Sequence, residues 1–384
     1  MKKPSLLIVS STDSRKDPRV WRQICCLKDE YNVTVVALTD CMVKNVNWIP
    51  IALKNSSKNW LLRKLSKAWN IIIKKDYNTW LMSSFSPAIE GEPKEYEVVI
   101  CNDQSPLGWA FKLANGAPVV FDAHEYYPRE FESSMKWRIL LKKYNEWICK
   151  TFIPQCAAVT TVSDGIAEEY KKNFACNPVV IKNAPEFENL EPQKVNGQIK
   201  IIHHGGAIPD RCLELMIETK KYLDDRFLLD LMLVDYGRKY YEKIKEMALN
   251  TPGVNWLQPV KMQDIAKKCN EYDIGLFLVP AVTFNLQCCL PNKFFEFIQA
   301  RLAIAVGPSI EMAKIVRERD LGVVSQDFSP LSMAEALNSL TYEDIMRFKF
   351  NSHEAARVYN SENEMKKLKE VLNNVRNIRL GTER

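Results

Sequence analysis

Residues 290–300 read Leu290-Pro291-Asn292-Lys293-Phe294-Phe295-Glu296-Phe297-Ile298-Gln299-Ala300, and they are the most informative part of this chain. A proline with its fixed φ and missing N–H fits the beginning of a helix. The free N–H groups and positive dipole end of a first helical turn attract phosphate, and Lys293 adds a point charge. Glu296, one turn further on, could accept two hydrogen bonds from a ribose diol. The same residues would also suit an ordinary amphipathic helix with a surface Lys–Glu pair, so both interpretations stay open.

The composition indicates a soluble globular protein. The 384 residues are 46% hydrophobic and 26% charged, and this length is typical of about two to three domains. The eleven cysteines form no CxxC pair and no zinc-ligand spacing, which indicates reduced thiols and therefore the cytoplasm. The first apolar run, Leu6–Val9, is too short for a signal peptide. No run reaches the roughly 18 apolar residues that a membrane-spanning helix needs.

The segment 54–75 is strongly basic and has helical periodicity. It contains no acid, and apolar residues recur at helical spacing between its cations, which are Lys54, Lys58, Arg63, Lys64, Lys67, Lys74 and Lys75. A basic amphipathic helix with tryptophans fits an anionic membrane surface, so we expect a peripheral protein on the inner face of the cell membrane. The helix could instead pack on the domain with its basic face in water. No motif of nucleic-acid recognition accompanies it, so we expect no nucleic-acid partner.

The first half of the chain alternates predicted strands and helices. Asp17-Pro18 predicts the beginning of a helix, with Asp17 as N-cap. Residues 135–152 read as one long helix. The predicted strands are Leu6–Ser10, Asn32–Thr39, Tyr96–Cys101, Pro118–Asp122, Ala158–Val162 and Pro178–Ile181. Repeated strand–helix units are typical of a parallel, doubly wound sheet.

A second alternation of the same kind follows a polar linker at 189–198. Its predicted strands are Lys200–His203, Phe227–Val234, Val254–Trp256, Ile274–Leu278 and Ala303–Val306. We therefore expect an α/β chain of two Rossmann-like domains, 1–190 and 199–350, with a helical tail at 351–384. A capping box, Ser361-x-x-Glu364, begins an apolar helix face in the tail, which could pack back on the N-terminal domain. Ligands of doubly wound sheets bind at the carboxyl ends of the strands.

Several motifs lie at such strand ends. Gly205 and Gly206 would let the backbone approach a ligand closely, and Arg211 could reach a phosphate with its planar fork; a plain tight turn and a solvated arginine are the alternatives. Asp122-Ala123-His124-Glu125 could suggest a metal site, but neighbouring side chains of a strand point to opposite faces, so we expect no bound metal. Arg19 could face a ligand or form a structural salt bridge. Asn102-Asp103 could line a ligand site or cap a helix.

Seven short motifs in order along nearly the whole chain resemble the retaining GT-B glycosyltransferases of glycosyltransferase family 4. They are Asp17-Pro18-Arg19-Val20, Cys101-Asn102-Asp103, Phe121-Asp122-Ala123-His124-Glu125, Thr161-Val162-Ser163, Ile181-Lys182-Asn183-Ala184-Pro185, His204-Gly205-Gly206-Ala207-Ile208-Pro209-Asp210-Arg211 and Pro291-Asn292-Lys293-Phe294-Phe295-Glu296. The GT-B fold implies two Rossmann-like domains that face each other across a cleft. No DxD motif, P-loop or GxGxxG fingerprint is present.

The resemblance implies a metal-independent hexosyltransferase that uses no cofactor beyond its UDP- or GDP-linked sugar donor. Its acceptor would be a glycan or a lipid-linked molecule in surface polysaccharide or glycolipid assembly. The implied catalytic residues are His124, Arg211 and Lys293. Residues implied to bind the donor are Gly205, Gly206, Leu290, Asn292 and Glu296, and those on the acceptor side are Arg19, Asn102 and Asp103.

One position departs from the pattern of this family. A second glutamate usually lies eight residues before the one matched by Glu296, where it holds the donor sugar, but this chain has Cys288 there. The ribose contact through Glu296 survives the change, whereas the contact to the sugar hydroxyls would have to come from elsewhere. The alternatives to a transferase are a nucleotide-sugar epimerase of the same fold and a non-catalytic protein that binds a nucleotide-sugar.

Overall fold

The computed structural model describes residues 3–51, 76–84, 87–88 and 95–382, so the predicted basic helix at 54–75 lies outside the described residues. The chain divides into two compact units. The first consists of Met1–Ile181 together with Met365–Arg384, and the second of Lys182–Glu364. The first unit ends before residue 190, and the tail from residue 351 is shared between the two units.

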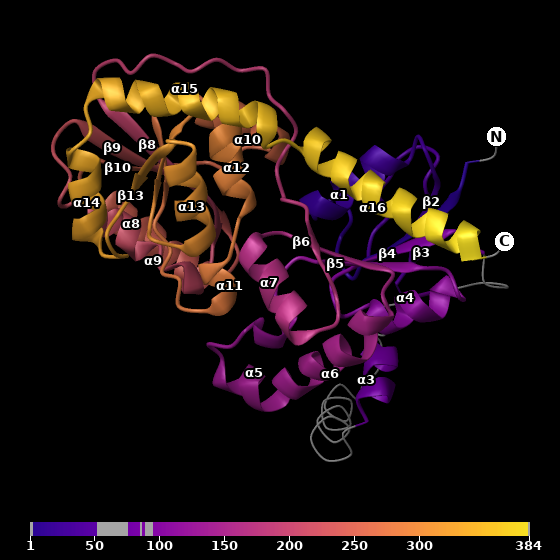
Figure 1. Cartoon of the computed structure of the whole chain (residues 1–384). Helices are drawn as coiled ribbons and strands as arrows, with labels where there is room; N and C mark the ends of the chain where they lie inside the picture. The colour runs from indigo at the N-terminus through magenta and orange to yellow at the C-terminus, as the bar shows by residue number, and fades with distance from the viewer. Residues whose placement is uncertain (1–2, 52–75, 85–86, 89–94, 383–384) are drawn as a thin grey trace. The chain divides into compact units, whose positions relative to one another are not determined.

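A parallel seven-stranded sheet forms the centre of the first unit (Figure 1). The strands follow the order β3-β2-β1-β4-β5-β6-β7. Every residue of β4 and β5 is buried, as expected for parallel strands covered on both faces. The strands are β1 (Ser5–Val9), β2 (Asn32–Ala37), β3 (Asn47–Pro50), β4 (Val98–Asn102), β5 (Val119–Ala123), β6 (Ala158–Thr161) and β7 (Val179–Val180).

The connections between these strands carry the helices of the first unit. As predicted, Asp17 is the N-cap of α1, where its carboxylate accepts hydrogen bonds from the backbone N–H groups of Arg19 and Val20. The helices are α1 (Pro18–Leu27), α3 (Tyr77–Ser84), α4 (Leu107–Ala114), α5 (Met135–Leu140), α6 (Lys142–Phe152) and α7 (Asp164–Asn173). The single helix predicted over 135–152 is wrong, because Leu141, with φ −116° and ψ −22°, interrupts it between α5 and α6.

The C-terminal helix α16 (Ser361–Thr382) completes the first unit. Leu368, Val371 and Leu372 pack into one hydrophobic core with Val20 and Ile24 of α1, and the two helices lie near each other in Figure 1. The predicted capping box is not formed as expected. Asn360 caps the helix by accepting from the N–H of Asn363, and the Glu364 carboxylate accepts from the N–H of Lys182 instead.

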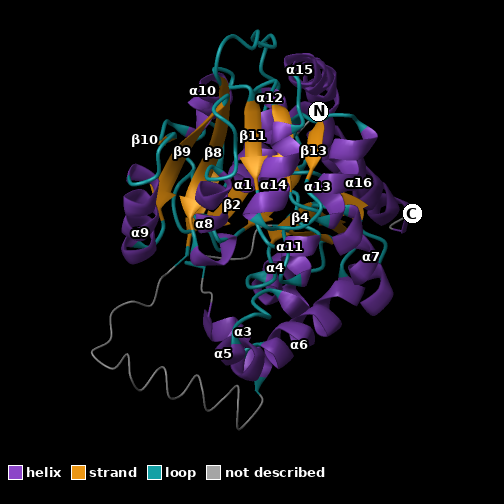
Figure 2. Cartoon of the chain, turned by 90° about the vertical axis from the view of Figure 1, so that its left-hand side faces the viewer, coloured by secondary structure: helices purple, strands orange, loops and turns teal. Residues whose placement is uncertain are grey.

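The second unit has a parallel six-stranded sheet with its own hydrophobic core. Figure 2 shows β10, β9, β8, β11 and β13 side by side; β12 lies between the last two. The strands are β8 (Ile199–Ala207), β9 (Phe227–Asp235), β10 (Val254–Leu257), β11 (Ile274–Phe277), β12 (Ala303–Val306) and β13 (Gly322–Val324). The helices are α8 (Glu214–Thr219), α9 (Arg238–Leu249), α10 (Ile265–Cys269), α11 (Phe284–Gln287), α12 (Asn292–Gln299), α13 (Ile310–Glu318), α14 (Pro330–Asn338) and α15 (Tyr342–Val358).

Two details of this unit bear on the candidate site. The predicted strand 200–203 continues to Ala207, so Gly205 and Gly206 pair with Leu233 and Val234 of β9 rather than form a turn. The predicted helix at 291–300 is confirmed as α12, with Pro291 at its N-cap in extended conformation. Both elements place their functional residues at the end of the sheet where ligands of this fold class bind.

Candidate active site

In the first unit, a buried salt bridge joins α1 to the carboxyl end of β5. Both guanidinium nitrogens Nε and Nη2 of Arg19 donate to the Asp122 carboxylate at 2.6 Å, and Nη1 donates to the carbonyl of Ile181 at 2.7 Å. Gln23 and Thr160 donate to the same carboxylate. Burial by itself would raise the pKa of Asp122, but Arg19 outweighs burial and holds the pKa well below its ordinary value. Asp122 is therefore a permanent anion inside the unit.

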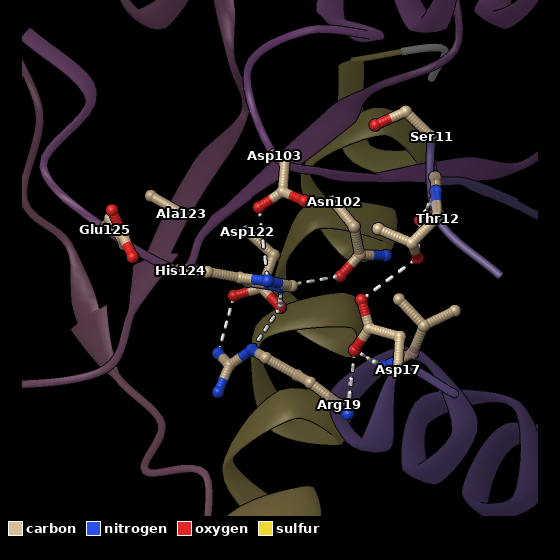
Figure 3. A network of polar contacts seen from close by, with 12 residues as sticks. Ser11, Thr12, Asp17, Arg19, Asn102, Asp103, Asp122, Ala123, His124 and Glu125 are labelled. Carbon is tan, nitrogen blue, oxygen red and sulfur yellow. Dashed lines mark hydrogen bonds and ion pairs between the residues drawn. The ribbon is translucent and has the colours of Figure 1, made fainter. Parts of the chain in front are cut away.

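His124 lies directly against this anion, at the end of β5 (Figure 3). Its Nε2 is 3.2 Å from Asn102 Oδ1 and 3.6 Å from Asp122 Oδ2, and its Nδ1 is 3.1 Å from Asp103 Oδ1. Burial lowers the pKa of His124, but Asp103 and Asp122 outweigh burial and raise it to about 9. His124 is thus an imidazolium at neutral pH, with an acceptor at each ring nitrogen.

Asp103 and Asn102 connect His124 to its surroundings. Asp103 follows β4 in a left-handed conformation, with φ 66°, and its carboxylate also accepts from the hydroxyl of Tyr127. Asn102 is fully buried and donates from Nδ2 to Gln23 Oε1 at 2.9 Å. Because Arg19 and Asn102 are both buried, their geometry favours positioning His124 over direct contact with an acceptor. Gln23 and Tyr127 belong to this network, although the sequence analysis did not single them out.

Glu125, the remaining residue of the motif, points away from the network in Figure 3 and is exposed. The Glu125 side chain, two residues beyond the end of β5, therefore lies outside the Arg19–Asp122 pair. Asp122 is the structural partner of Arg19. The described residues hold no group of three or more His, Cys, Asp or Glu side chains that could bind a metal ion.

In the second unit, two cations converge on the backbone of β8. Gly205 has φ +122°, and a Cβ built on it would lie 2.8 Å from Lys293 Nζ and 3.7 Å from Arg211 Nη1. Arg211 ends a short 3-10 turn (Pro209–Arg211) and donates from Nη1 to the carbonyl of Gly206 at 3.1 Å. Lys293, in the first turn of α12, is only 6% exposed. The missing side chain of Gly205 thus leaves the space that the lysine ammonium occupies.

The electrostatics of this pair favour an anionic ligand. Burial, and then the neighbouring Arg211, lower the pKa of Lys293 well below its ordinary value, and burial lowers the pKa of Arg211. His203 adds no positive charge, because burial, and then Lys293, lower its pKa well below its ordinary value. Its Nδ1 is 2.8 Å from the carbonyl of Leu276 and its Nε2 is 3.4 Å from Lys293 Nζ. Glu296 raises the pKa of Lys293, and an anion bound beside Lys293 and Arg211 would favour their charged forms further.

Glu296 lies one turn further along α12, with a side chain 13% exposed. Its Oε2 is 3.4 Å from His204 Nε2. Burial, and then Lys293 and Arg211, lower the pKa of His204 to about 3, so this imidazole is neutral. The sequence analysis gave His203 and His204 no role, yet both touch the predicted donor-binding residues. The consecutive histidines before two glycines at a strand end were the available signal.

The remaining predicted residues of this unit lie at the beginning of α12 or just before it. Leu290 and Cys288 are buried, whereas Asn292 is partly exposed. Tyr236 was not predicted; its exposed ring covers Gly206, where an added Cβ would meet ring carbons at 2.7 and 2.9 Å. Cys288 stands where the family pattern has a glutamate.

Comparisons with known proteins found similarity to one family model and to several solved structures. Residues 26–185 match the family model described as Glycosyltransferase Family 4. No curated protein matches the chain in sequence. None of the described helices has the length and apolar character that crossing a membrane requires.

Solved structures share the fold of the chain at low sequence identity. Anabaena Alr3699/HepE in complex with UDP and glucose is 12% identical with a TM-score of 0.67, and the match covers 97% of this chain and 100% of that chain. An α,α-trehalose-phosphate synthase (UDP-forming) from Burkholderia vietnamiensis is 9% identical with a TM-score of 0.67, covering 100% and 99%. A glycosyltransferase from Rickettsia africae is 14% identical with a TM-score of 0.66, covering 98% and 99%.

The family match and the shared fold bear out the resemblance noted in the sequence. Two parallel sheets with helices form this chain, and its fold is shared by solved glycosyltransferase structures. The chain has the GT-B fold, and its residues 26–185 are similar to Glycosyltransferase Family 4.

Proposed function

We propose that this chain transfers a hexosyl group from a UDP- or GDP-linked donor to an acceptor hydroxyl, with retention of anomeric configuration and without a metal ion. The observation that carries the proposal is the convergence of Lys293 and Arg211 on Gly205. Bond breaking at the sugar leaves a nucleoside diphosphate, and its growing negative charge is what fixed cations stabilise in the transition state. HepE, whose fold this chain shares, is described in complex with UDP-glucose.

The neighbouring residues suit the rest of a donor. Glu296 would accept hydrogen bonds from the ribose diol, and neutral His204 beside it adds no competing charge. Backbone groups at Leu290 and Asn292, with the backbone of Gly205 and Gly206, would contact the diphosphate and the sugar. Because no acid stands at Cys288, these backbone groups would also hold the sugar hydroxyls.

In the first unit, His124 would face the reacting sugar and acceptor, with Asp103 beside it on the acceptor side. The Arg19–Asp122 pair and Asn102 would hold the imidazolium in place. A glycan or lipid-linked acceptor in surface polysaccharide or glycolipid assembly would suit a cytoplasmic protein bound peripherally to the membrane. The basic segment 54–75 supports this part of the proposal by its composition.

Calorimetry with UDP, GDP and ADP tests the donor site in the full chain. We expect one diphosphate to bind selectively, and Lys293→Ala and Glu296→Ala each to weaken it by about tenfold or more. Gly205→Ala should weaken it as well, since its Cβ would displace the Lys293 ammonium. Gly237→Ala is the matched control, because its φ is 179° and nothing lies within 4 Å of an added Cβ.

Turnover then separates the transferase from a second candidate, a non-catalytic nucleotide-sugar-binding protein. The buried cysteine at position 288 favours that candidate, because the usual acid is missing there. Tight binding of a UDP- or GDP-sugar without transfer to any glycan or lipid-linked acceptor would support it. Transfer with the donor's anomeric configuration, read by NMR of the product, would support the transferase; an inverted product would contradict retention.

A further inference from the structure

The first unit presents three large apolar side chains in a row on its surface. Phe131, Met135 and Ile139 are 54%, 67% and 71% exposed, and we call them the α5 surface. They follow one another at intervals of four residues, and Met135 and Ile139 belong to α5 itself. Met135 and Ile139 therefore lie on the same side of α5, and Phe131 is exposed in the turn that precedes the helix. Single exposed apolar residues are ordinary, but a row of them on one side is typical of an interaction surface.

The rest of α5 is fixed to the unit, so this surface is not a frayed end. Trp137 of the same helix is 5% exposed, and Ser134 caps α5 by accepting from the N–H of Trp137. The following helix α6 is anchored by Asn145, whose Nδ2 donates to the carbonyl of Tyr127 at 3.1 Å. Figure 1 shows α5 next to α6. The inward tryptophan and the outward row therefore divide the helix into two faces.

Positive charge surrounds the apolar row. Lys136, Arg138 and Lys143 are exposed and form no ion pair with another described residue. The nearby acids are already compensated: Glu132 pairs with Arg129 at 2.5 Å, and Glu146 lies 4.0 Å from Lys142. Burial raises the pKa of Glu130 to about 7, which reduces its negative charge at neutral pH. An apolar row with unbalanced cations beside it is complementary to an anionic lipid surface.

We propose that the α5 surface binds an anionic lipid bilayer, with Phe131, Met135 and Ile139 inserted among the acyl chains and Lys136, Arg138 and Lys143 beside lipid phosphates. This deepens the proposed function, on which it rests, because it places the contact seven residues along the chain from His124. An acceptor carried by the membrane would then be bound by the same unit that carries His124. The surface is separate in sequence from the basic segment 54–75.

Sedimentation with vesicles tests this proposal on the full chain. We expect the wild type to pellet with vesicles of mixed phosphatidylglycerol and phosphatidylcholine, and much less with phosphatidylcholine alone. The apolar variant Phe131→Ser/Met135→Ser/Ile139→Ser and the basic variant Lys136→Gln/Arg138→Gln/Lys143→Gln should each bind about tenfold more weakly or worse. The basic variant changes only exposed side chains, so it keeps the test decisive if the apolar variant folds poorly.

Matched controls carry the same substitutions elsewhere. Leu249→Ser/Ile310→Ser/Phe350→Ser removes three apolar side chains that are 64%, 58% and 56% exposed in the second unit, and Lys171→Gln/Lys172→Gln/Lys194→Gln removes three exposed cations. Both should pellet like the wild type. UDP binding, measured in every variant, should not change. A wild type that binds vesicles but no nucleotide would refute the proposed function and leave the lipid contact standing.

Three results would overturn the lipid contact. The wild type could bind neither kind of vesicle. The apolar and basic variants could both bind like the wild type while Arg63→Glu/Lys64→Glu/Lys67→Glu abolishes binding, which would assign the contact to the segment 54–75. The wild type could also self-associate in light scattering without lipid, with the apolar variant monomeric, which would make the row a protein–protein interface.

Discussion

His124 carries its positive charge in a place where burial opposes it. Asp103 and Asp122 raise its pKa to about 9, against an ordinary value of about 6.5 in an unfolded chain. The native state therefore binds the His124 proton more tightly than the unfolded state does. The resulting stabilisation is fully present below pH 6.5 and is lost as the pH rises through about 9.

We expect the free energy of unfolding of the first unit to reflect this proton. The wild type should exceed His124→Gln by about 2–3 kcal/mol below pH 6.5, and the difference should shrink steadily up to pH 9. Urea unfolding, monitored through hydrogen exchange of the β4 and β5 amides, measures this difference in the free energy of unfolding. Asp103→Asn should move the decline toward neutral pH, since Asp103 is the largest contributor that raises the pKa. A difference that does not change with pH would contradict the assignment of the charge.

At the scale of single residues, the sequence predicted which side chains take part but not which residues they contact. It placed Asp17 as a cap and Lys293 at a helix start because both signals are local. It left Arg19 between a ligand contact and a salt bridge, because Asp122 is distant in sequence and adjacent only in the folded sheet. The Lys293 ammonium fills the space that the missing side chain of Gly205 leaves. This contact joins β8 to α12, which are far apart in the sequence, so spacing alone could not predict it.

The C-terminal helix α16 contributes to the hydrophobic core of the first unit, although most of that unit lies at the other end of the chain. Leu372 has no exposed surface, and it packs in the same core as Val20, Ile24 and Val35. Removing three side-chain carbons there loses apolar burial and leaves a cavity. The same core contains side chains of β1, β2, β4 and β5.

We expect Leu372→Ala to lower the free energy of unfolding of the first unit by about 2–5 kcal/mol. Asn373→Ala, an exposed change on the next residue of the same helix, should shift it by less than about 0.5 kcal/mol. Urea unfolding of the full chain measures both. If hydrogen exchange in the second unit accelerates as much as exchange in β1 and β2, the helix does not belong to the first unit's core and the prediction fails.

At the scale of elements, strong hydrophobic periodicity predicted helices and strands correctly, whereas weak periodicity did not. The alternation of apolar strands and amphipathic helices predicted both parallel sheets, because strands buried on two faces are nearly continuous apolar runs. The break at Leu141 and the extension of β8 through Gly205 and Gly206 were missed. Glycine has little strand preference of its own, and only its pairing with β9 keeps the segment extended.

The whole molecule consists of two units, each with its own sheet and hydrophobic core. The sequence analysis expected the apolar face of the tail to pack back on the N-terminal domain, and α16 contributes Leu368, Val371 and Leu372 to the core of the first unit. The chain leaves the first unit after Ile181, forms the whole second unit, and returns to the first unit at Met365. Lys182–Glu364 is therefore a continuous segment that contains an entire unit.

This continuity makes the second unit testable by itself. Arg211, Lys293, Glu296 and both glycines lie within Lys182–Glu364, and so does the core that supports them. We expect a fragment of these residues to fold cooperatively and to bind the same nucleoside diphosphate as the full chain, within about tenfold in affinity.

Circular dichroism and calorimetry of the fragment measure folding and binding separately, with Lys293→Ala in the fragment as the matched control. The control should fold equally well, because the substitution keeps α12. It should bind at least about tenfold more weakly, because the positive charge of Lys293 is lost. A folded fragment that binds no nucleotide, beside a full chain that does, would show that the first unit supplies an essential part of the donor site. The two cations at Gly205 would then be insufficient for the affinity that we assign to them.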